Sequence, residues 1–290
     1  MPAWGDSAET IYDTMKLQTP NANGMWLDME ATLDIDKADY YIIQDYTDMQ
    51  IPDISKAYYF AREVPGAGRV DHIPEAKKFS WLDKSSYLYT KWVYPGEMTG
   101  GVSLSYDFLT SQEPPIKKRD VLCIQSDKYF LEGHKKRVNF IKKLVGDYRD
   151  EIDLFGSIRV LLSYYGHGET RVDNKFAKLK DYKYCLAFDN GQYDNYFGTQ
   201  FTDAILSWAV PIYWGAPNIL DFFPKDSFIS FDASSMDEPR RIMEILESDS
   251  YEKRLPALRE ARDLILNKYN IWPTIYEAIT SGKTTWNRLK

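Results

Sequence analysis

The residues best placed for chemistry lie in one loop between a buried strand and a helix. Tyr182 to Phe188 is an apolar run rich in aromatic and β-prone residues, which predicts a buried strand. Asp189 and Asn190 follow it directly, and from Phe197 onward apolar residues recur at helical spacing. Ligands of parallel sheets bind beyond the carboxyl ends of the strands, where helix N-termini offer free N–H groups to anions. The loop therefore predicts a site for a phosphate or a nucleotide.

The elements that position this loop read as a parallel α/β arrangement. A second buried strand at residues 209–214, closed by Gly215 and Pro217, completes a βαβ unit. Further strands are predicted at residues 38–44, 56–61, 120–126, 152–156 and 227–231, and helices at 29–33, 236–246, 250–269 and up to 279. A helix with apolar residues at Val138, Ile141 and Leu144 is expected after the strand at 120–126.

Residues 182–217 resemble the donor-binding segment of glycosyltransferase family 10, the α-1,3-fucosyltransferases. The order and spacing agree over the whole segment. The matching letters are Tyr182-Lys183, Leu186, Phe188-Asp189-Asn190, Tyr196-Phe197, Asp203-Ala204, Pro211 to Gly215, and Pro217. The resemblance implies a GT-B-type α/β fold with two Rossmann-like domains facing a cleft. Residues 1–114 would form the acceptor-side domain. Residues 115–290 would bind the nucleotide sugar, with terminal helices that pack back on the first domain.

The resemblance also assigns donor-binding residues. Asn190 and Tyr196 match family donor-site positions, and Asp189 replaces a glutamate conservatively. Where the family has Thr-Glu-Lys, this chain has Gly198, Thr199 and Gln200. In the family the lysine helps to neutralise the diphosphate and the glutamate holds nucleotide hydroxyls. Thr199 and Gln200 can hydrogen-bond but carry no charge, so the departure concerns either the identity of the donor or the activity itself.

Arg137 is the expected diphosphate ligand. Family members place an arginine early in the helix that follows the strand predicted here at residues 120–126. A guanidinium group can pair with two phosphate oxygens and keeps its charge. The alternative is that Arg137 joins the neighbouring lysines in a solvated helix face. Lys135, Lys136, Lys142 and Lys143 make up the rest of that face.

Glu63 is the candidate general base. The resemblance implies a glutamate at a strand end, just before a small residue and a proline, and Glu63 precedes Val64-Pro65. A carboxylate there could take the proton of an acceptor hydroxyl as the glycosidic bond forms. The alternative is a surface glutamate paired with Arg62, which would have little effect.

Charge and cysteine usage narrow the class of protein. A net charge of −7 argues against nucleic acid as a partner, because surfaces that bind nucleic acids are basic. Cys123 and Cys185 lie in apolar runs and are expected to be buried free thiols. No apolar run has the length of a membrane span, and no signal-peptide pattern opens the chain. We therefore expect a cytoplasmic protein without a transmembrane segment, resembling the soluble bacterial or viral members of the family.

The sequence offers no pattern for a metal or a bound cofactor. Asp34 and Asp36 form an Asp-x-Asp triplet, which we interpret as a solvated turn rather than a metal site. The three histidines are not at metal-ligand spacing. There is no Gly-x-x-x-x-Gly-Lys loop and no Gly-x-Gly-x-x-Gly turn, which argues against an ATPase, a kinase or a dehydrogenase.

The residues alone predict an α/β protein with an anion site after Phe188, and the resemblance implies an inverting glycosyltransferase that needs no metal and no cofactor beyond its donor substrate. The resemblance makes transfer of fucose from GDP-fucose to a saccharide hydroxyl the leading hypothesis. Two alternatives stay open: a transferase for a different nucleotide sugar, and a catalytically silent module that binds a saccharide or a nucleotide. The sequence indicates neither the acceptor and its linkage nor the oligomeric state.

Overall fold

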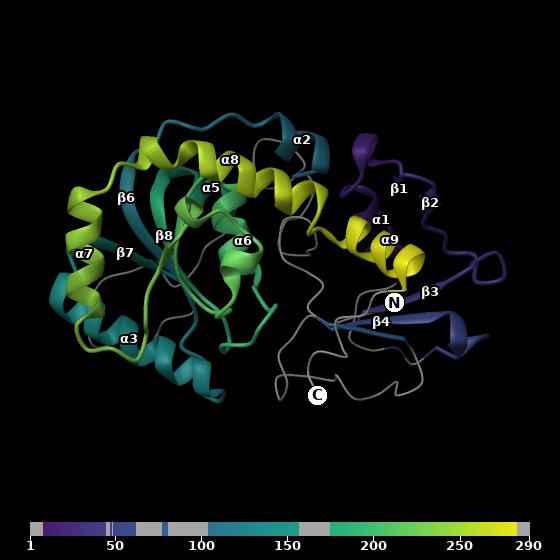
Figure 1. Cartoon of the computed structure of the whole chain (residues 1–290), viewed down its shortest axis with the longest axis horizontal. Helices are drawn as coiled ribbons and strands as arrows, with labels where there is room; N and C mark the ends of the chain where they lie inside the picture. The colour runs from purple at the N-terminus through teal and green to yellow at the C-terminus, as the bar shows by residue number, and fades with distance from the viewer. Residues whose placement is uncertain are drawn as a thin grey trace. The chain divides into compact units, whose positions relative to one another are not determined.

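The computed structural model of the 290-residue chain describes residues 8–44, 47, 49–61, 77–80, 104–156 and 175–282. The chain divides into two compact units (Figure 1). Unit 1 consists of Met1–Pro95, Val102–Gln112 and Ile265–Lys290, and unit 2 of Gly96–Gly101 and Glu113–Leu264. The last boundary between the units, after Leu264, falls inside the long helix α8, Tyr251–Asn267.

Unit 2 is built on a five-stranded parallel sheet with the order β10-β9-β8-β6-β7. Its strands are β6 (Arg119–Ile124), β7 (Ile152–Phe155), β8 (Tyr182–Phe188), β9 (Val210–Trp214) and β10 (Ile229–Ser230). All residues of β9 and all but one of β8 are buried. Such continuous apolar runs are typical of parallel strands that are covered on both faces.

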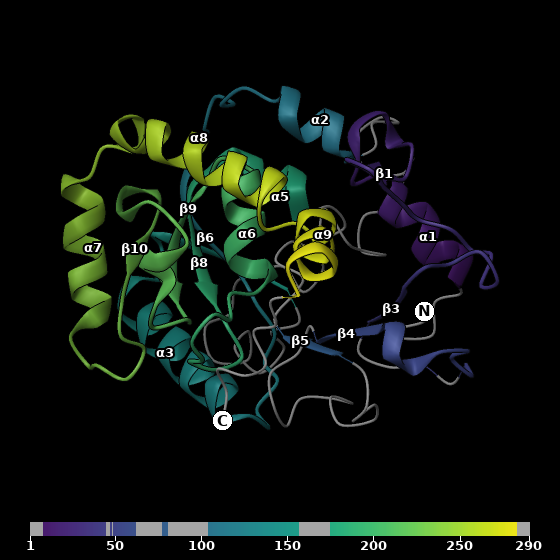
Figure 2. The ribbon, with the colours of Figure 1, turned by 45° about the vertical axis from the view of Figure 1, so that its right-hand side comes forward.

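Helices cover both faces of this sheet. They are α3 (Glu132–Tyr148), α5 (Lys175–Asp181), α6 (Thr199–Leu206), α7 (Glu238–Ser248) and α8, with short 3-10 helices η3 (Ile219–Asp221) and η4 (Lys225–Ser227). The helices α3 and α7 contact each other, while α5 and α6 contact each other and β8. Figures 1 and 2 show α3 and α7 on one side of the sheet and α5 and α6 on the other.

Unit 1 contains a three-stranded parallel sheet with the order β3-β4-β5. Its elements are α1 (Ala8–Lys16), η1 (Pro20–Ala22), β1 (Met25–Trp26), β2 (Met29–Glu30), β3 (Tyr41–Gln44), η2 (Ile54–Lys56), β4 (Ala57–Ala61), β5 (Lys77–Ser80), α2 (Tyr106–Ser111) and α9 (Ile271–Ser281). Tyr58 and Phe60 on β4 pack with Trp272 and Ile275 of α9, while Tyr59 joins a separate core cluster. This alternation is the period-two pattern of a strand buried on both sides.

Most of the predicted elements are present, with three differences. Residues 29–33 are not helical, because Met29–Glu30 pairs antiparallel with Met25–Trp26 and Leu27 turns the chain with a φ of 55°. The strand predicted at 227–231 is shortened to Ile229–Ser230, because residues 225–227 form η4. The helix predicted from residue 236 begins at Glu238, with Pro239 in its first turn, where a proline costs no hydrogen bond.

Two further observations concern the chain as a whole. Cys123 and Cys185 are buried free thiols, as expected. Of the helices that the structure describes, none combines the length and the apolar character that crossing a bilayer requires.

Candidate functional site

The strand order identifies one place in unit 2 where a ligand would bind. Strands β6 and β8 are parallel neighbours, but their following helices, α3 and α6, pack on opposite faces of the sheet. In such sheets, the loops that leave adjacent strands in opposite directions open a crevice at the carboxyl ends of those strands. Here the two loops are residues 125–131 after β6 and 189–198 after β8. The loop predicted to hold an anion therefore lies where this rule places a ligand.

Arg137 lies on the α3 side of the crevice. Its Nη2 donates to the Ser126 carbonyl oxygen at 3.1 Å and to Ser126 Oγ at 3.3 Å, just beyond the end of β6. The side chain is only 3% exposed, and its Nε has no hydrogen-bond partner among the described residues. Burial lowers the pKa of Arg137 to about 10, so the guanidinium stays charged at neutral pH. A buried cation with an unfilled donor is suited to an anionic ligand.

The first turn of α3 is joined to the loop after β8. A Cβ on Gly133 would lie 2.1 Å from the Asn190 carbonyl oxygen, so only glycine permits this approach. The Leu131 N–H donates to His134 Nδ1 at 3.4 Å, which leaves the proton on Nε2 to be donated to Asn190 Oδ1 at 3.0 Å. Burial and the charge of Arg137 both lower the pKa of His134, so the neutral ring is favoured.

His134 is the residue that sequence reasoning missed. The sequence shows only that it is not at metal-ligand spacing from another histidine, whereas the structure buries it in the first turn of α3, where it links Leu131 to Asn190. The available signal was its position three residues after Leu131. At that spacing a side chain can accept a hydrogen bond from the residue preceding a helix, a role usually taken by Glu or Gln.

Asp189 is a buried link rather than an open carboxylate. It is 3% exposed; Oδ1 accepts from the Gly198 N–H at 2.9 Å and Oδ2 accepts from the Tyr213 hydroxyl. Its own N–H donates to the Trp214 carbonyl oxygen at 3.0 Å. A Cβ on Gly215 would lie 2.2 Å from Oδ2, so this contact also requires glycine. Asp189 thereby connects β8, β9 and the start of α6.

The start of α6 offers less to an anion than the sequence suggests. Gly198 is the N-cap residue, and its N–H is used by Asp189. Among the described residues, the N–H groups of Thr199 and Gln200 have no hydrogen-bond partner, as expected for a first helical turn. Gln200 Oε1 is buried and likewise unpartnered among those residues. Tyr196 is buried at 5% exposure, with its ring edge-on to Tyr193.

The structure thus brings together seven of the eight predicted site residues at one edge of the sheet. These are Arg137, Asp189, Asn190, Tyr196, Gly198, Thr199 and Gln200. Glu63, the candidate base, lies outside the described residues. Asp34 and Asp36 form a local turn, in which Asp34 Oδ1 accepts from the Asp36 N–H at 3.2 Å. Within the described ranges, no group of three or more His, Cys, Asp or Glu side chains is arranged to hold a metal ion.

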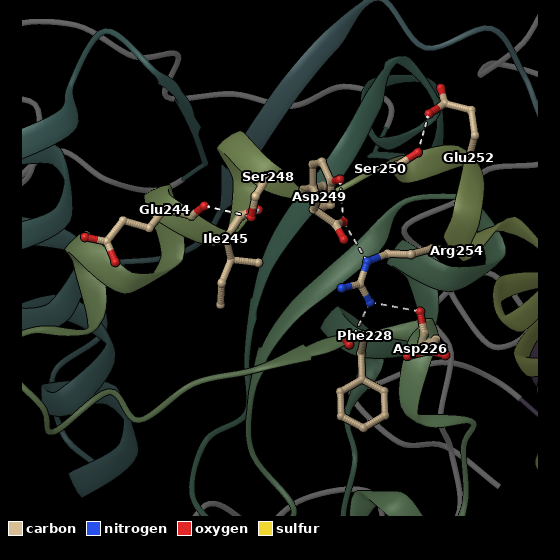
Figure 3. A network of polar contacts seen from close by, with 10 residues as sticks. Asp226, Phe228, Glu244, Ile245, Ser248, Asp249, Ser250, Glu252 and Arg254 are labelled. Carbon is tan, nitrogen blue, oxygen red and sulfur yellow. Dashed lines mark hydrogen bonds and ion pairs between the residues drawn. The ribbon is translucent and has the colours of Figure 1, made fainter.

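A second polar network in unit 2 has a different character (Figure 3). Asp249, between α7 and α8, accepts from Tyr184 Oη at 2.7 Å and from Arg254 Nε at 2.6 Å. Arg254 also donates to the carbonyl oxygens of Asp226 and Phe228. The charges of Asp249 and Arg254 are paired with each other, so this network joins helices to strands and offers no unfilled charge to a ligand.

Comparison with known proteins relates most of unit 2 to a family of glycosyltransferases. Residues 115–254 match the family model described as glycosyltransferase family 10 (fucosyltransferase), C-terminal part. The α-(1,3)-fucosyltransferase FucT of Helicobacter pylori is 38% identical over 84 residues, which cover 29% of this chain and 16% of that protein. The GDP-fucose protein O-fucosyltransferase 3 of Gallus gallus is 28% identical over 152 residues, covering 50% of this chain and 31% of that protein.

A crystal structure of an α1,3-fucosyltransferase with GDP has the same fold. It matches with a TM-score of 0.50 at 17% identity, covering 89% of this chain and 79% of that one. The GT-B-type α/β fold is therefore confirmed, as is the resemblance of residues 115–254 to glycosyltransferase family 10. The matched segment contains Arg137 and the whole loop 189–198. The chain spans less than a third of the length of the two curated relatives.

Proposed function

We propose that this chain is a glycosyltransferase that uses GDP-fucose and transfers fucose to a saccharide hydroxyl. The observation that carries the proposal is Arg137: a buried cation with an unfilled Nε at the crevice between β6 and β8, within the segment that matches the family. The donor diphosphate would bind between Arg137 and the first turn of α6. Unit 2 would hold the donor, and unit 1 would provide the acceptor side.

The proposed reaction is a direct displacement with inversion at the anomeric carbon. The Glu63 carboxylate takes the proton of the acceptor hydroxyl, the hydroxyl oxygen forms the new bond to the anomeric carbon, and the bond to the diphosphate breaks. The departing GDP takes the bonding electrons, and its developing charge is stabilised by Arg137. In this scheme side chains supply the positive charge, so the reaction proceeds without a metal ion.

The location of the protein is part of the same proposal. The two buried free thiols support the cytoplasmic location expected from the sequence, because reducing compartments keep cysteines unpaired.

A second candidate is a transferase for another nucleotide sugar. It is favoured by one observation: the first turn of α6 has the neutral Thr199 and Gln200, with Gln200 Oε1 buried and unpartnered in the described part of the chain. A nucleotide sugar with an N–H or O–H group at this point could donate a hydrogen bond to Gln200 Oε1. A silent binding module is the third candidate, and turnover separates it from the other two.

Calorimetric titration of the purified protein with GDP-fucose, GDP, GDP-mannose and UDP-sugars tests the proposal. We expect GDP and GDP-fucose to bind in the presence of EDTA, and the Arg137→Ala variant to lose this binding. Arg149→Ala is the matched control, because Arg149 lies on the same α3 side of the sheet but is exposed at the helix C-terminus. Binding of a UDP-sugar instead would identify a different donor substrate. Absence of binding to any of these nucleotides would refute the enzyme proposal.

Transfer of labelled fucose to a panel of saccharide acceptors tests the chemistry. The Glu63→Gln variant should bind GDP-fucose as the wild type does but transfer little, because an amide cannot take the proton. Nucleotide binding without transfer or donor hydrolysis would leave the silent module as the better account.

A further inference from the structure

The site as described lacks positive charge for a diphosphate. The start of α6 already faces the Asp189 carboxylate, which accepts the Gly198 N–H at 2.9 Å. A carboxylate at a helix N-terminus uses the favourable end of the dipole and repels a second anion. Gln200 adds no charge. The cations whose charges act on His134, at the start of α3, are Arg137 and Lys128, whereas the ligand group carries several negative charges.

Lys136, the residue before Arg137, places a second cation at the same edge. Its Nζ lies 5.8 Å from the ring centroid of Trp214, and its side chain is half-buried. Trp214 is the last residue of β9, and its carbonyl oxygen accepts the Asp189 N–H. The Trp214 Nε1 is buried and has no partner among the residues described. The ammonium of Lys136 therefore lies near the carboxyl end of β9, while Arg137 lies near that of β6.

The charge of Lys136 is not neutralised within the described part of the protein. No carboxylate there forms an ion pair with it, whereas the adjacent Lys135 pairs with Glu132 at 3.4 Å. An ammonium over an aromatic face gains little at a partly exposed site. An anionic ligand explains the position of the Lys136 ammonium better than the contact with Trp214 does.

We propose that Lys136 and Arg137 act as a cation pair for the donor diphosphate, with Lys136 supplying the charge that Gln200 lacks. Trp214 holds the ammonium against the carboxyl end of β9, and Ser126 holds the guanidinium at the end of β6. Both side chains extend from α3, and each would contact phosphate oxygens near a different strand end. The inference rests on the proposed function, because it assigns a residue to that same site.

The test compares Lys136→Met with Lys143→Met by calorimetric titration. Lys143 is half-buried on the same helix, and seven residues later it lies on nearly the same face, about 10.5 Å further along the axis. The probes are GDP and guanosine. We expect Lys136→Met to weaken GDP binding by at least about tenfold, as for a lost charge-assisted contact, and to leave guanosine binding unchanged. Lys143→Met should change GDP binding by less than about twofold.

Lys136→Arg keeps the charge and provides the rescue. It should retain GDP affinity within about threefold of the wild type, and all three variants should melt at the wild-type temperature. Equal GDP affinities for the two methionine variants would overturn the inference, and so would an arginine variant as weak as Lys136→Met. If the wild type itself binds no nucleoside diphosphate, the proposed function has failed instead. If it binds UDP in place of GDP, UDP and uridine become the probes and the same comparisons decide.

Discussion

Replacing Asp189 with asparagine separates a structural role from direct contact with a ligand. The carboxylate has two acceptors in use: Oδ1 takes the Gly198 N–H and Oδ2 takes the Tyr213 hydroxyl. The Tyr213 oxygen in turn accepts the Ala216 N–H at 2.8 Å. An amide offers one acceptor only, so in the Asp189→Asn variant either the part-buried Gly198 N–H or the buried Tyr213 hydroxyl loses its partner.

The expected loss of stability follows from this count. A hydrogen bond to a charged group contributes about 1.5–3 kcal/mol, and an unpaired buried donor costs a similar amount. We therefore expect Asp189→Asn to lower the free energy of unfolding by about 2–3 kcal/mol. Adding Tyr213→Phe removes the donor that has lost its acceptor. The loss of unfolding free energy in the double variant should therefore be smaller than the sum of the two single losses, by at least about 1 kcal/mol.

Urea unfolding followed by tryptophan fluorescence and circular dichroism measures these values. Calorimetric titration of the same variants with GDP measures their affinity for the nucleotide. The reasoning would be refuted if Asp189→Asn unfolded within about 0.5 kcal/mol of the wild type and yet lost GDP binding. That result would mean that the carboxylate contacts the ligand directly and does not hold the start of α6.

Three further outcomes are expected. Arg137→Lys keeps the charge but loses the guanidinium fork, so GDP affinity should fall about tenfold by calorimetry; unchanged affinity would rule out two-point contact. Lys175→Met breaks a 2.6 Å ion pair with the fully buried Asp203, so it should lower the free energy of unfolding, measured in urea, by about 3 kcal/mol. Lys183→Met is the control: it breaks an exposed ion pair with Asp120 and should lower the free energy of unfolding by less than about 1 kcal/mol. Burial lowers the pKa of Lys117 to about 7 from 10.5, so the unfolded chain binds more protons between these values. The stability of the wild type relative to Lys117→Met should therefore rise with pH across that window and be flat below it; urea unfolding that shows the opposite slope would contradict this assignment.

The sheet of unit 2 was predictable because its strands are buried on both faces. Such strands read as continuous apolar runs, and the predicted strand at Tyr182 to Phe188 matches β8 residue by residue. Placing the site at the carboxyl end of that strand needed only the βαβ rule. Arg137 came from the family resemblance, since its neighbours Lys135 and Lys136 look no different in a helical pattern.

The inward direction of Asp189 could not be predicted. Its Oδ2 partner, Tyr213, lies 24 residues later in the chain, and the contact depends on the absence of a side chain at Gly215. This feature arises from a tertiary contact that no local pattern encodes. The start of α3 depends on a local contact instead: Leu131 has no capping oxygen, and the His134 ring three residues later accepts its N–H, in place of the usual Glu or Gln.

Hydrogen–deuterium exchange with and without GDP-fucose tests the central claim most directly, because it reports where the nucleotide binds. The account predicts slower exchange in peptides that cover residues 131–137 and 189–200 at saturating donor, with no change in α7 (Glu238–Ser248). Saturable binding that protects other segments and leaves these two unchanged would contradict it, as would the absence of any protection.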